Sequence, residues 1–243
     1  MAPDSENTTN DFTVKTTQQA CVISYNSRGF SALQQNFIKT LVNEQTVGNK
    51  LPILCNQENF ILRGNFYKIL QTLPGFHCFI NPAVKTCQDR GRPKGGMFIA
   101  IPDSIKSQVT DVSPGHWRVQ AITISSTTST SLLINTYFPC DTRVAGDALN
   151  EAIEVLEVIK RLVESTACNS VIICGDINTD FRRNTGQVTL VSEAITELNL
   201  LKIWDKYEID FTCVHNSNED KVGTAIIDHF FCSTEIGNHI LDA

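Results

Sequence analysis

The sequence contains no apolar run of the roughly twenty residues that a membrane-spanning helix needs. It also lacks a basic start followed by an apolar segment, which excludes a signal or transit peptide at its beginning. There is no basic excess, since 20 Lys and Arg stand against 26 Asp and Glu, for a net charge of −6. Because tight non-specific binding to nucleic acid usually needs a basic face, this balance disfavours that class of protein. We expect a soluble protein that is not secreted, and acidic residues that hold a metal remain compatible with the composition.

Paired cysteine motifs are missing too, although the chain has nine cysteines. Their number is odd, no two form a CxxC pair, and several lie in apolar runs. They are Cys21, Cys55, Cys78, Cys87, Cys140, Cys168, Cys174, Cys213 and Cys232. This pattern is typical of reduced, buried thiols in the cytosol or nucleus, and disfavours a disulfide framework or a zinc site.

The chain is long enough for one large domain with a substantial core. Residues 1–19 are rich in Thr, Asn, Asp and Gln and have no hydrophobic periodicity, which predicts a disordered tail. Residues 20–243 would then form the domain, and they contain no internal repeat of fixed period.

The first helix is expected to begin at Ser31, with Gln34 three residues later in a capping-box arrangement. Its apolar stripe would be Leu33, Phe37 and Leu41.

Helical spacing of apolar residues predicts three further helices. The longest spans residues 145–165, where Glu157 and Arg161 would pair on the outer face. The apolar positions of the three are Phe66, Ile69 and Leu70; Leu149, Ala152, Ile153, Leu156, Ile159 and Val163; and Val188, Val191, Ile195 and Leu198.

Short apolar runs between Gly, Pro and Ser-Thr clusters predict strands. They cover residues 21–25, 51–55, 97–101, 117–124, 132–137, 170–176, 210–214 and 225–232, with a hairpin connection at 125–131. Helices interleave with these β-rich blocks, so we expect an α/β fold of two packed, mixed or antiparallel sheets flanked by helices.

The most informative strand is Ser170–Asn178, which reads SVIICGDIN. Its apolar run stops at Gly175 and is followed by Asp176 and Asn178. A run this apolar is typical of a strand buried on both faces, and α/β folds place their chemistry at the carboxyl ends of such strands. Asp176 and Asn178, two apart on an extended segment, would face the same way.

Other predicted strands also end on polar residues. In two sheets stacked face to face these ends can converge on one rim and form a shared cluster of oxygen ligands. Such ligands suit Mg²⁺ or Mn²⁺ better than zinc. The full set is Asn26, Glu58, Tyr137, Asp176, Asn178 and Asp228. Each residue alone also has a structural interpretation: a carboxylate can cap a helix, Asn forms turns, a tyrosine can fill the core, and Asp228 can pair with a cation.

Six segments occur in the order that one superfamily shows: SYNSRGF (24–30), NQE (56–58), GRPKGGMFIAI (91–101), NTYFP (135–139), GDIN (175–178), and DFT with IIDHFF (210–212, 226–231). With them the chain resembles the endonuclease/exonuclease/phosphatase superfamily. More narrowly, it resembles the apurinic-endonuclease-like domain of LINE-type, non-LTR retrotransposons. One such match is weak, but six in order over nearly everything after residue 20 are specific. The resemblance implies a DNase-like four-layer α/β sandwich.

The resemblance also implies a role for each matching residue. Glu58 would be the principal metal ligand, with Asn26 supporting the metal and its water. Asp176 would orient and deprotonate the attacking water, while Asn178 would hold a non-bridging phosphate oxygen. Tyr137 would stabilise charge that builds on the phosphate or the leaving oxygen.

Two further residues follow from the same resemblance. Thr212 would contact the DNA backbone, and Asp228 would orient a catalytic histidine in a Ser-Asp-His motif on a last strand. That motif is expected beyond Ala243, so the chain is interpreted as a fragment that ends before its domain does. His229 cannot substitute, because neighbours on a strand point to opposite faces. His239 lies too early and lacks the preceding Asp.

Two loops leave alternatives open. Arg90, Arg92 and Lys94 form the only local basic cluster, which could reach a phosphate or be a solvated charged loop. Residues 215–223 lie where the family has a hairpin that enters a DNA groove, but their central acidic residues meet phosphates poorly, and a solvated turn explains them about as well.

Together the resemblance implies a Mg²⁺-dependent DNA endonuclease that nicks double-stranded target DNA and leaves a 3′-hydroxyl. That end would prime a downstream reverse transcriptase domain, in the nucleus after synthesis in the cytoplasm. One rival is a superfamily phosphatase or phosphodiesterase acting on lipid or inositol head groups. The other is a catalytically silent nucleic-acid-binding remnant.

Overall fold

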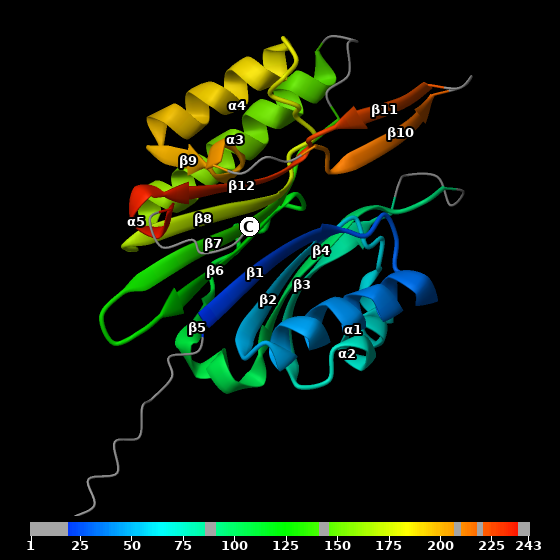
Figure 1. The fold of residues 1–243 in the computed structure, drawn as a ribbon, viewed down its shortest axis with the longest axis vertical. Coiled ribbons are helices and arrows are strands. Elements are labelled where there is room, and N and C mark those ends of the chain that lie inside the picture. The colour runs from blue at the N-terminus through cyan, green and yellow to red at the C-terminus, as the bar shows by residue number, and fades with distance from the viewer. Residues whose placement is uncertain (1–18, 86–90, 141–145, 207–209, 218–220, 238–243) are drawn as a thin grey trace, which may run out of the picture.

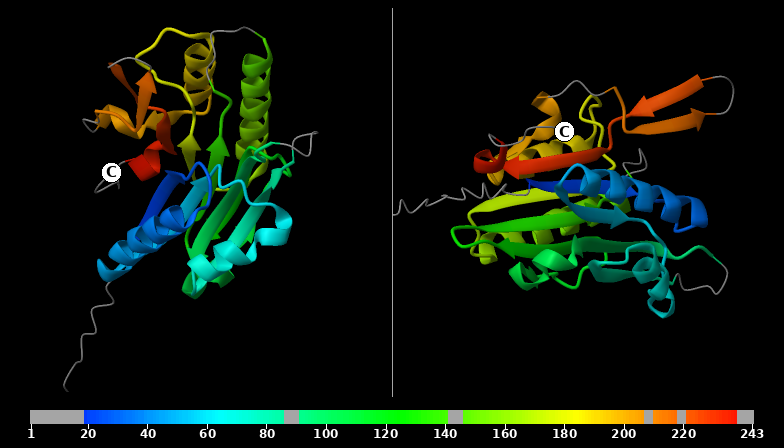
Figure 2. Two further views of the ribbon diagram at one scale, coloured as in Figure 1. Left: turned by 90° about the vertical axis from the view of Figure 1, so that its right-hand side faces the viewer. Right: turned by 60° about the horizontal axis from the view of Figure 1, so that its bottom comes forward.

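The computed structural model describes residues 19–85, 91–140, 146–206, 210–217 and 221–237, with backbone alone at 215–217 and 221–223. These residues form four layers, because two β-sheets pack face to face and helices cover both outer faces (Figures 1 and 2). The predicted four-layer α/β sandwich is confirmed. The tail predicted at 1–19 lies, apart from Gln19, outside the described residues.

The first sheet has four strands in the order β1-β2-β4-β3, with β1 and β2 parallel and the other pairs antiparallel. Helices α1 and α2 cover its outer face (Figure 1). The bounds are β1 Gln19–Asn26, α1 Ala32–Val47, β2 Lys50–Gln57, the 3₁₀ turn η1 Arg63–Asn65, α2 Tyr67–Thr72, β3 Phe76–Val84, β4 Lys94–Pro102 and the 3₁₀ turn η2 Asp103–Gln108.

The second sheet has six strands in the order β5-β6-β7-β8-β12-β9, and α3 and α4 lie on its outer face (Figure 1). Only β7 and β8 are parallel. The bounds are β5 Val109–Asp111, β6 Val119–Ser125, β7 Thr130–Tyr137, α3 Asp147–Ser165, β8 Ser170–Asp176, α4 Gly186–Glu197, β9 Leu200–Lys202, the 3₁₀ turn η3 Ile203–Lys206, β12 Asp228–Ser233 and α5 Thr234–Gly237. A separate hairpin pairs β10 Cys213–Ser217 with β11 Lys221–Ala225.

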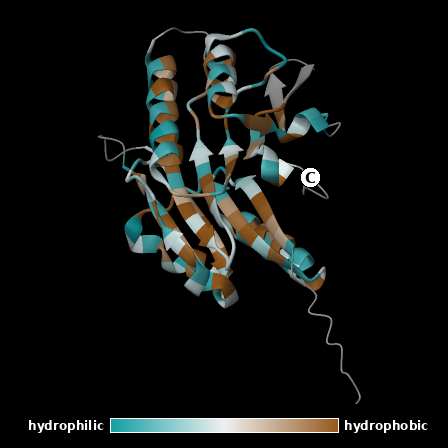
Figure 3. Cartoon of the chain, turned by 90° about the vertical axis from the view of Figure 1, so that its left-hand side faces the viewer, coloured by the Kyte–Doolittle hydropathy of each residue, from teal (hydrophilic) through white to brown (hydrophobic). Residues whose placement is uncertain are grey.

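Three apolar clusters fill the three spaces between the layers. Ile53, Cys55, Ile99, Ile122 and Leu133 lie among those that join the two sheets. The other two clusters lie under α1 and α2 and under α3 and α4. Figure 3 shows the same division, since brown apolar segments fill the strands and teal polar segments lie on the outer sides of the helices. Burial on both faces explains why the strand sequences read as continuous apolar runs.

The stripe predicted for α1 is wrong. Leu33 is 76% exposed and Phe37 is 49% exposed, whereas Ile38 and Val42 are buried against the first sheet. Two apolar rows lie side by side on this helix, and only contact with the sheet decided which one packs. Ser31 does precede α1, but its hydroxyl bonds the Gln34 side chain and makes no side-chain bond to a backbone N–H.

Two other helix predictions are confirmed with changes. α3 begins at Asp147, and its buried residues are Ala152, Val155, Ile159 and Leu162, so the core face is rotated from the predicted one. Arg161 Nε donates to the Glu157 backbone carbonyl at 3.2 Å, in place of the predicted carboxylate pair. The helix predicted through Phe66 is short, and its Leu70 is 51% exposed.

The strand predicted over residues 225–232 is two strands. β11 ends at Ala225 and pairs with β10, whereas β12 begins at Asp228 and pairs with β8 and β9. The interruption at Ile226 and Ile227 lets the chain leave the hairpin and enter the six-stranded sheet. The strand predicted at 210–214 correspondingly starts at Cys213.

The described part of the chain also bears on two compositional expectations. None of its helices is long and apolar enough to cross a membrane. Its eight cysteines form no disulfide, and Cys55, Cys174, Cys213 and Cys232 are buried.

Candidate active site

Strand direction brings the predicted site residues to one rim of the sandwich. The parallel pair β1 and β2 ends with Asn26 beside Gln57, and Glu58 follows. In the other sheet, β7 and β8 end with Tyr137 beside Asp176, and the antiparallel β12 starts with Asp228 opposite Asp176. Side chains that lie far apart in the sequence therefore meet where four strands end and one begins.

Asn26 connects the two principal carboxylates. Its Nδ2 donates to Glu58 Oε2 at 2.9 Å and to Asp176 Oδ2 at 2.5 Å. Glu58 and Asp176 therefore lie on either side of one amide group, although they come from different sheets.

The backbone around Glu58 is unusual and well fixed. Glu58 has a φ of 51°, in the left-handed region that few non-glycine residues adopt. Its carbonyl accepts from Gly29 N at 2.7 Å, and the next N–H, that of Asn59, donates to Gly96 O at 3.1 Å. These bonds hold the carboxylate at the end of β2 instead of letting the chain continue as a strand.

Tyr137 and Asn178 complete the rim around the carboxylates. The Tyr137 hydroxyl hydrogen-bonds Glu58, and its pKa lies well above the usual range because the ring is buried and the Glu58 charge is close. The backbone N–H of Asn178 donates to Asp176 Oδ1 at 3.0 Å, and its Nδ2 donates to the Phe138 carbonyl at 2.9 Å. The alternative in which Asp176 caps the following helix is wrong, because its carboxylate accepts from Asn178 N in a tight turn and Thr185 caps α4.

Thr212 and Asp228 lie together behind Asp176. The Thr212 hydroxyl oxygen accepts from Ile227 N at 2.9 Å and from Asp228 N at 3.1 Å. This arrangement holds the first residue of β12 in place. The structure therefore brings all seven predicted residues to one rim, whereas their individual roles stay predictions.

The pKa of Asp176 is strongly perturbed, and its side chain is almost completely buried. Burial, followed by the Asp228 charge, raises the pKa of Asp176 to about 7, although the bonds from Asn26 and Asn178 act in the opposite direction. Burial also raises the pKa of Asp228. A buried carboxylate whose pKa is raised further by a second carboxylate is common at catalytic sites, because function and not stability selects the arrangement.

Arg28 is a site residue that sequence reasoning missed. Its Nη2 donates to Cys213 Sγ at 3.3 Å, and its positive charge lowers the pKa of Asp228 and acts on Asp176 and Glu58. The available signal was its position two residues after Asn26, but the direction of an exposed arginine depends on the tertiary contact with β10.

The oxygen donors fit Mg²⁺, which binds through one or two carboxylates and keeps several waters. Among the described residues, no group of three or more His, Cys, Asp or Glu side chains is arranged to hold a metal. Glu58 and Asp176 are the pair that would hold the ion. Asn26 turns its amide nitrogen toward them, and its Oδ1 accepts from Arg28 N at 3.0 Å, so its predicted ligand role requires the amide to turn over.

His229 lies apart from the site, as its place on the strand predicted. It is buried between Phe181 and Phe231, and its Nε2 lies 2.7 Å from the Thr179 carbonyl and 3.1 Å from that of Ile226. His239 lies outside the described residues.

The burial of His229 predicts acid sensitivity. Burial lowers its pKa from 6.5 to about 4. Between these two pH values the imidazole is protonated in the unfolded chain but neutral in the folded protein. The stabilising contribution is therefore complete above pH 6.5 and is lost as the pH falls toward 4. Compared with a His229→Gln variant, the wild type should lose about 3 kcal/mol of unfolding free energy between pH 7 and pH 4. Urea titrations at both pH values measure this, and parallel pH profiles for the two proteins would contradict it.

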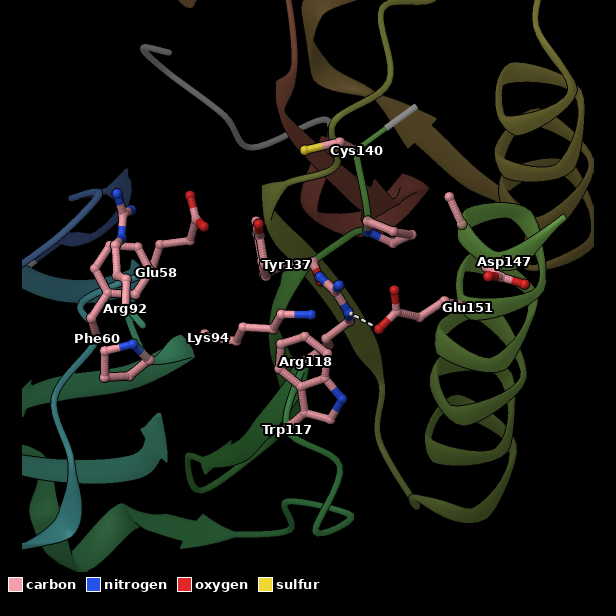
Figure 4. Close-up of a pocket in the computed structure, with 14 residues that line it drawn as sticks. Glu58, Phe60, Arg92, Lys94, Trp117, Arg118, Tyr137, Cys140, Asp147 and Glu151 are labelled. Atoms are coloured by element: carbon pink, nitrogen blue, oxygen red, sulfur yellow. Dashed lines mark hydrogen bonds and ion pairs between the residues drawn. The ribbon is translucent and has the colours of Figure 1, made fainter. Parts of the chain in front are cut away.

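A pocket of about 460 Å³ opens beside Glu58 and Tyr137 (Figure 4). Its walls are Phe60, Arg92, Pro93, Lys94 and Gly95 on one side, and Trp117, Arg118, Pro139, Cys140, Asp147, Ala148 and Glu151 on the other. Sequence reasoning found Arg92 and Lys94 but missed the opposite wall, which comes from the residues just before β6, the residues just after β7 and the first turns of α3.

Comparisons with known proteins agree with the fold. No family model matches the sequence, and no curated protein matches it significantly. Solved structures do match: the AP endonuclease LMAP from Leishmania major has a TM-score of 0.66 at 15% identity, covering 91% of this chain and 81% of that one. The endonuclease domain of TRAS1, a telomere-specific non-LTR retrotransposon, has a TM-score of 0.59 at 18% identity, with coverages of 89% and 86%.

Bacterial proteins with the same fold match as well. The 3′-5′ exonuclease NExo from Neisseria meningitidis has a TM-score of 0.63 at 16% identity, covering 91% of this chain and 90% of that one. An endonuclease/exonuclease/phosphatase family protein from Leptotrichia buccalis has a TM-score of 0.58 at 14% identity, with coverages of 90% and 89%. These matches, together with the two stacked sheets, show that the chain has the DNase-like fold of the endonuclease/exonuclease/phosphatase superfamily.

Proposed function

We propose that this protein is a divalent-metal-dependent DNA endonuclease that hydrolyses one phosphodiester of double-stranded DNA and leaves a 3′-hydroxyl. The observation that carries the proposal is the double hydrogen bond from Asn26 to Glu58 and Asp176. It brings together two carboxylates from different sheets beside a tyrosine and an asparagine, which is a costly arrangement for stability alone.

The described residues suit hydrolysis of a phosphate ester. Asp176 is a partly protonatable carboxylate that can accept a proton from water. The Tyr137 hydroxyl keeps its proton and can donate a hydrogen bond to a developing negative charge. Asn178 has a second amide hydrogen for a phosphate oxygen. A bound Mg²⁺ or Mn²⁺ would neutralise charge on the phosphate.

Plasmid nicking tests the proposal. Supercoiled plasmid should be converted to open circles in Mg²⁺ or Mn²⁺ but not in EDTA when the protein carries the Ser-Asp-His strand that the resemblance implies, and weakly or not at all without that strand. A Glu58→Gln variant should be at least about a hundredfold slower, because it loses the charge that would hold the cation.

Glu44→Gln is the matched control, since Glu44 is an exposed glutamate on α1. It should nick at the wild-type rate. Equal rates for the wild type and Glu58→Gln would refute this site. If the protein with the Ser-Asp-His strand binds DNA but never nicks it, the silent remnant is favoured, and hydrolysis of inositol phosphates in preference to plasmid would favour the phosphatase rival.

The biological setting is part of the same proposal. The likeness to the TRAS1 endonuclease domain and the GRPKGG segment support a retroelement origin, in which the 3′-hydroxyl primes a downstream reverse transcriptase in the nucleus. The coding sequence that follows this chain tests it: a reverse transcriptase reading frame is expected there, and an unrelated frame would contradict the retroelement setting.

A further inference from the structure

The pocket beside Glu58 is lined by aromatic and cationic side chains that the proposed hydrolysis does not use. Only Glu58 and Tyr137 belong to the site already described, and the other twelve lining residues have no role in it. Figure 4 shows Lys94 and Arg118 pointing into the space between Phe60 and α3. The walls combine flat rings with cations, and the volume lies within the range of small-ligand sites.

Arg118 is a structural residue of the pocket wall opposite Phe60, and its charge is not available to a ligand. Its buried guanidinium donates from Nε to Glu151 at 2.9 Å and from Nη1 to the Tyr137 carbonyl at 3.2 Å. It also stacks 3.9 Å from the centre of the Trp117 ring. The Glu151 carboxylate neutralises it, so its contribution is to fix Trp117 and Tyr137.

Gly95, on the opposite wall, lies in close contact with the Trp117 ring. Its φ is +70°, and an added Cβ would lie 2.8 Å from Trp117 Cε3. Only a glycine therefore lets the backbone of β4 approach the indole this closely. Trp117 is thus held between Gly95 and Arg118, with its remaining edge on the pocket.

Arg92 and Lys94 are the cations that remain available. Both are exposed, and neither forms an ion pair with any described residue. The Arg92 guanidinium lies 3.6 Å from the centre of the Phe60 ring, which orients it without neutralising its charge. Because the whole chain carries a net charge of −6, such local cations decide where a phosphate can bind.

We infer that this pocket is a nucleotide subsite next to the scissile phosphate, where one nucleotide leaves the stack of its strand. Arg92 and Lys94 bind its phosphate, and its base lies against the guanidinium plane of Arg92, which Phe60 supports from behind, and against the exposed edge of Trp117. Bases stack on aromatic rings and on guanidinium planes, whereas a duplex phosphate alone needs a cationic surface and no hollow. The inference rests on the proposed function for its substrate, DNA.

Fluorine NMR tests the subsite without any catalysis. The chain has two tryptophans, Trp117 and Trp204, so 5-fluorotryptophan labelling gives two resonances, and a Trp117→Phe variant assigns them. The 5′-phosphorylated dinucleotide pTpT, titrated in EDTA, should shift the Trp117 resonance saturably and leave that of Trp204 in place.

Substitutions locate the phosphate contact. Arg92→Ala/Lys94→Ala should weaken pTpT binding at least about tenfold, the loss expected for phosphate-binding cations. The matched control, Lys39→Ala/Lys106→Ala, removes two exposed lysines outside the pocket and should bind like the wild type. No shift at Trp117, or equal affinity in all three proteins, would overturn the subsite. An identical shift and midpoint with inorganic phosphate alone would overturn base recognition.

Kinetics separate this inference from the proposed function. Arg92→Ala/Lys94→Ala should slow plasmid nicking by at least about tenfold more than it slows hydrolysis of bis(p-nitrophenyl) phosphate, which has no base for the pocket. Equal losses on both substrates would overturn the subsite. If the protein with the Ser-Asp-His strand hydrolyses neither substrate, the proposed function fails, and the NMR titration still decides whether the pocket binds a nucleotide.

Discussion

Asp176→Asn should abolish nicking and at the same time make the protein more stable. The activity is expected to fall by about a thousandfold or more, because the amide cannot accept a proton from water. The gain in stability follows from the raised pKa. The folded protein keeps the Asp176 proton to about pH 7, whereas the unfolded chain releases it near pH 3.8, so the wild type loses stability as the pH rises through this range.

Two opposing contributions set the change in unfolding free energy of Asp176→Asn. A shift of about three pKa units corresponds to about 4 kcal/mol above pH 7. Part of this gain is lost in the variant, because the hydrogen bonds that Asn26 and Asn178 donate to the Asp176 carboxylate become weaker when an amide accepts them. A net stabilisation of about 2 kcal/mol at pH 8 remains.

Urea unfolding in EDTA at pH 8 and pH 4 measures this effect, since EDTA removes any cation that would compensate the carboxylates. The advantage of Asp176→Asn should be present at pH 8 and absent at pH 4. Asp103→Asn makes the same chemical change on an exposed residue at the opposite end of β4 from Lys94, and should leave stability and nicking near wild type. A variant that is less stable than wild type at pH 8 would show that Asp176 is a structural residue.

Gly175→Ala should cost more stability than any other single methyl addition at the rim. Gly175 has a φ of +144°, and an added Cβ would lie 1.9 Å from the Thr136 carbonyl oxygen. The oxygen and the Cα that would carry the Cβ belong to the backbones of the central pair β7 and β8, so neither can move without breaking the ladder. We expect a loss of at least about 4 kcal/mol, or a chain that does not fold.

Gly64→Ala is the matched control for this effect. An added Cβ at Gly64 meets nothing within 4 Å, and its φ is not in the left-handed region. Its unfolding free energy should stay within about 0.5 kcal/mol of wild type. Urea midpoints compare the two variants, and recovery of soluble protein serves as the measure if Gly175→Ala does not fold. Equal midpoints would mean that the β8 turn before Asp176 differs from the one described.

The strands and the positions of the candidate residues at their ends followed from local patterns, whereas the roles of those residues came only from the family resemblance and stay predictions. Continuous apolar runs typical of buried strands predicted β2, β4, β7 and β8. Polar residues at or just after the carboxyl ends of β2, β7 and β8 are Glu58, Tyr137, Asp176 and Asn178. The strand predictions succeeded because a strand that is buried on both faces consists of apolar residues until it ends.

Other predictions failed where a local pattern allowed two outcomes. Both apolar rows of α1 satisfy helical spacing, and contact with the sheet selected Ile38 and Val42 over Leu33 and Phe37. The residues Ala225 to Cys232 read as one strand, but two different partners divide them.

The sequence by itself determined that strands buried on both faces end in carboxylate and amide side chains, because the apolar runs and their polar ends are written in consecutive residues. Tertiary structure alone decided that Asn26 bridges Glu58 and Asp176, that Arg28 reaches Cys213, and that Arg118 fixes Trp117 across a pocket. These contacts join residues from separate sheets and helices, and their geometry depends on how the layers stack, which no local pattern specifies.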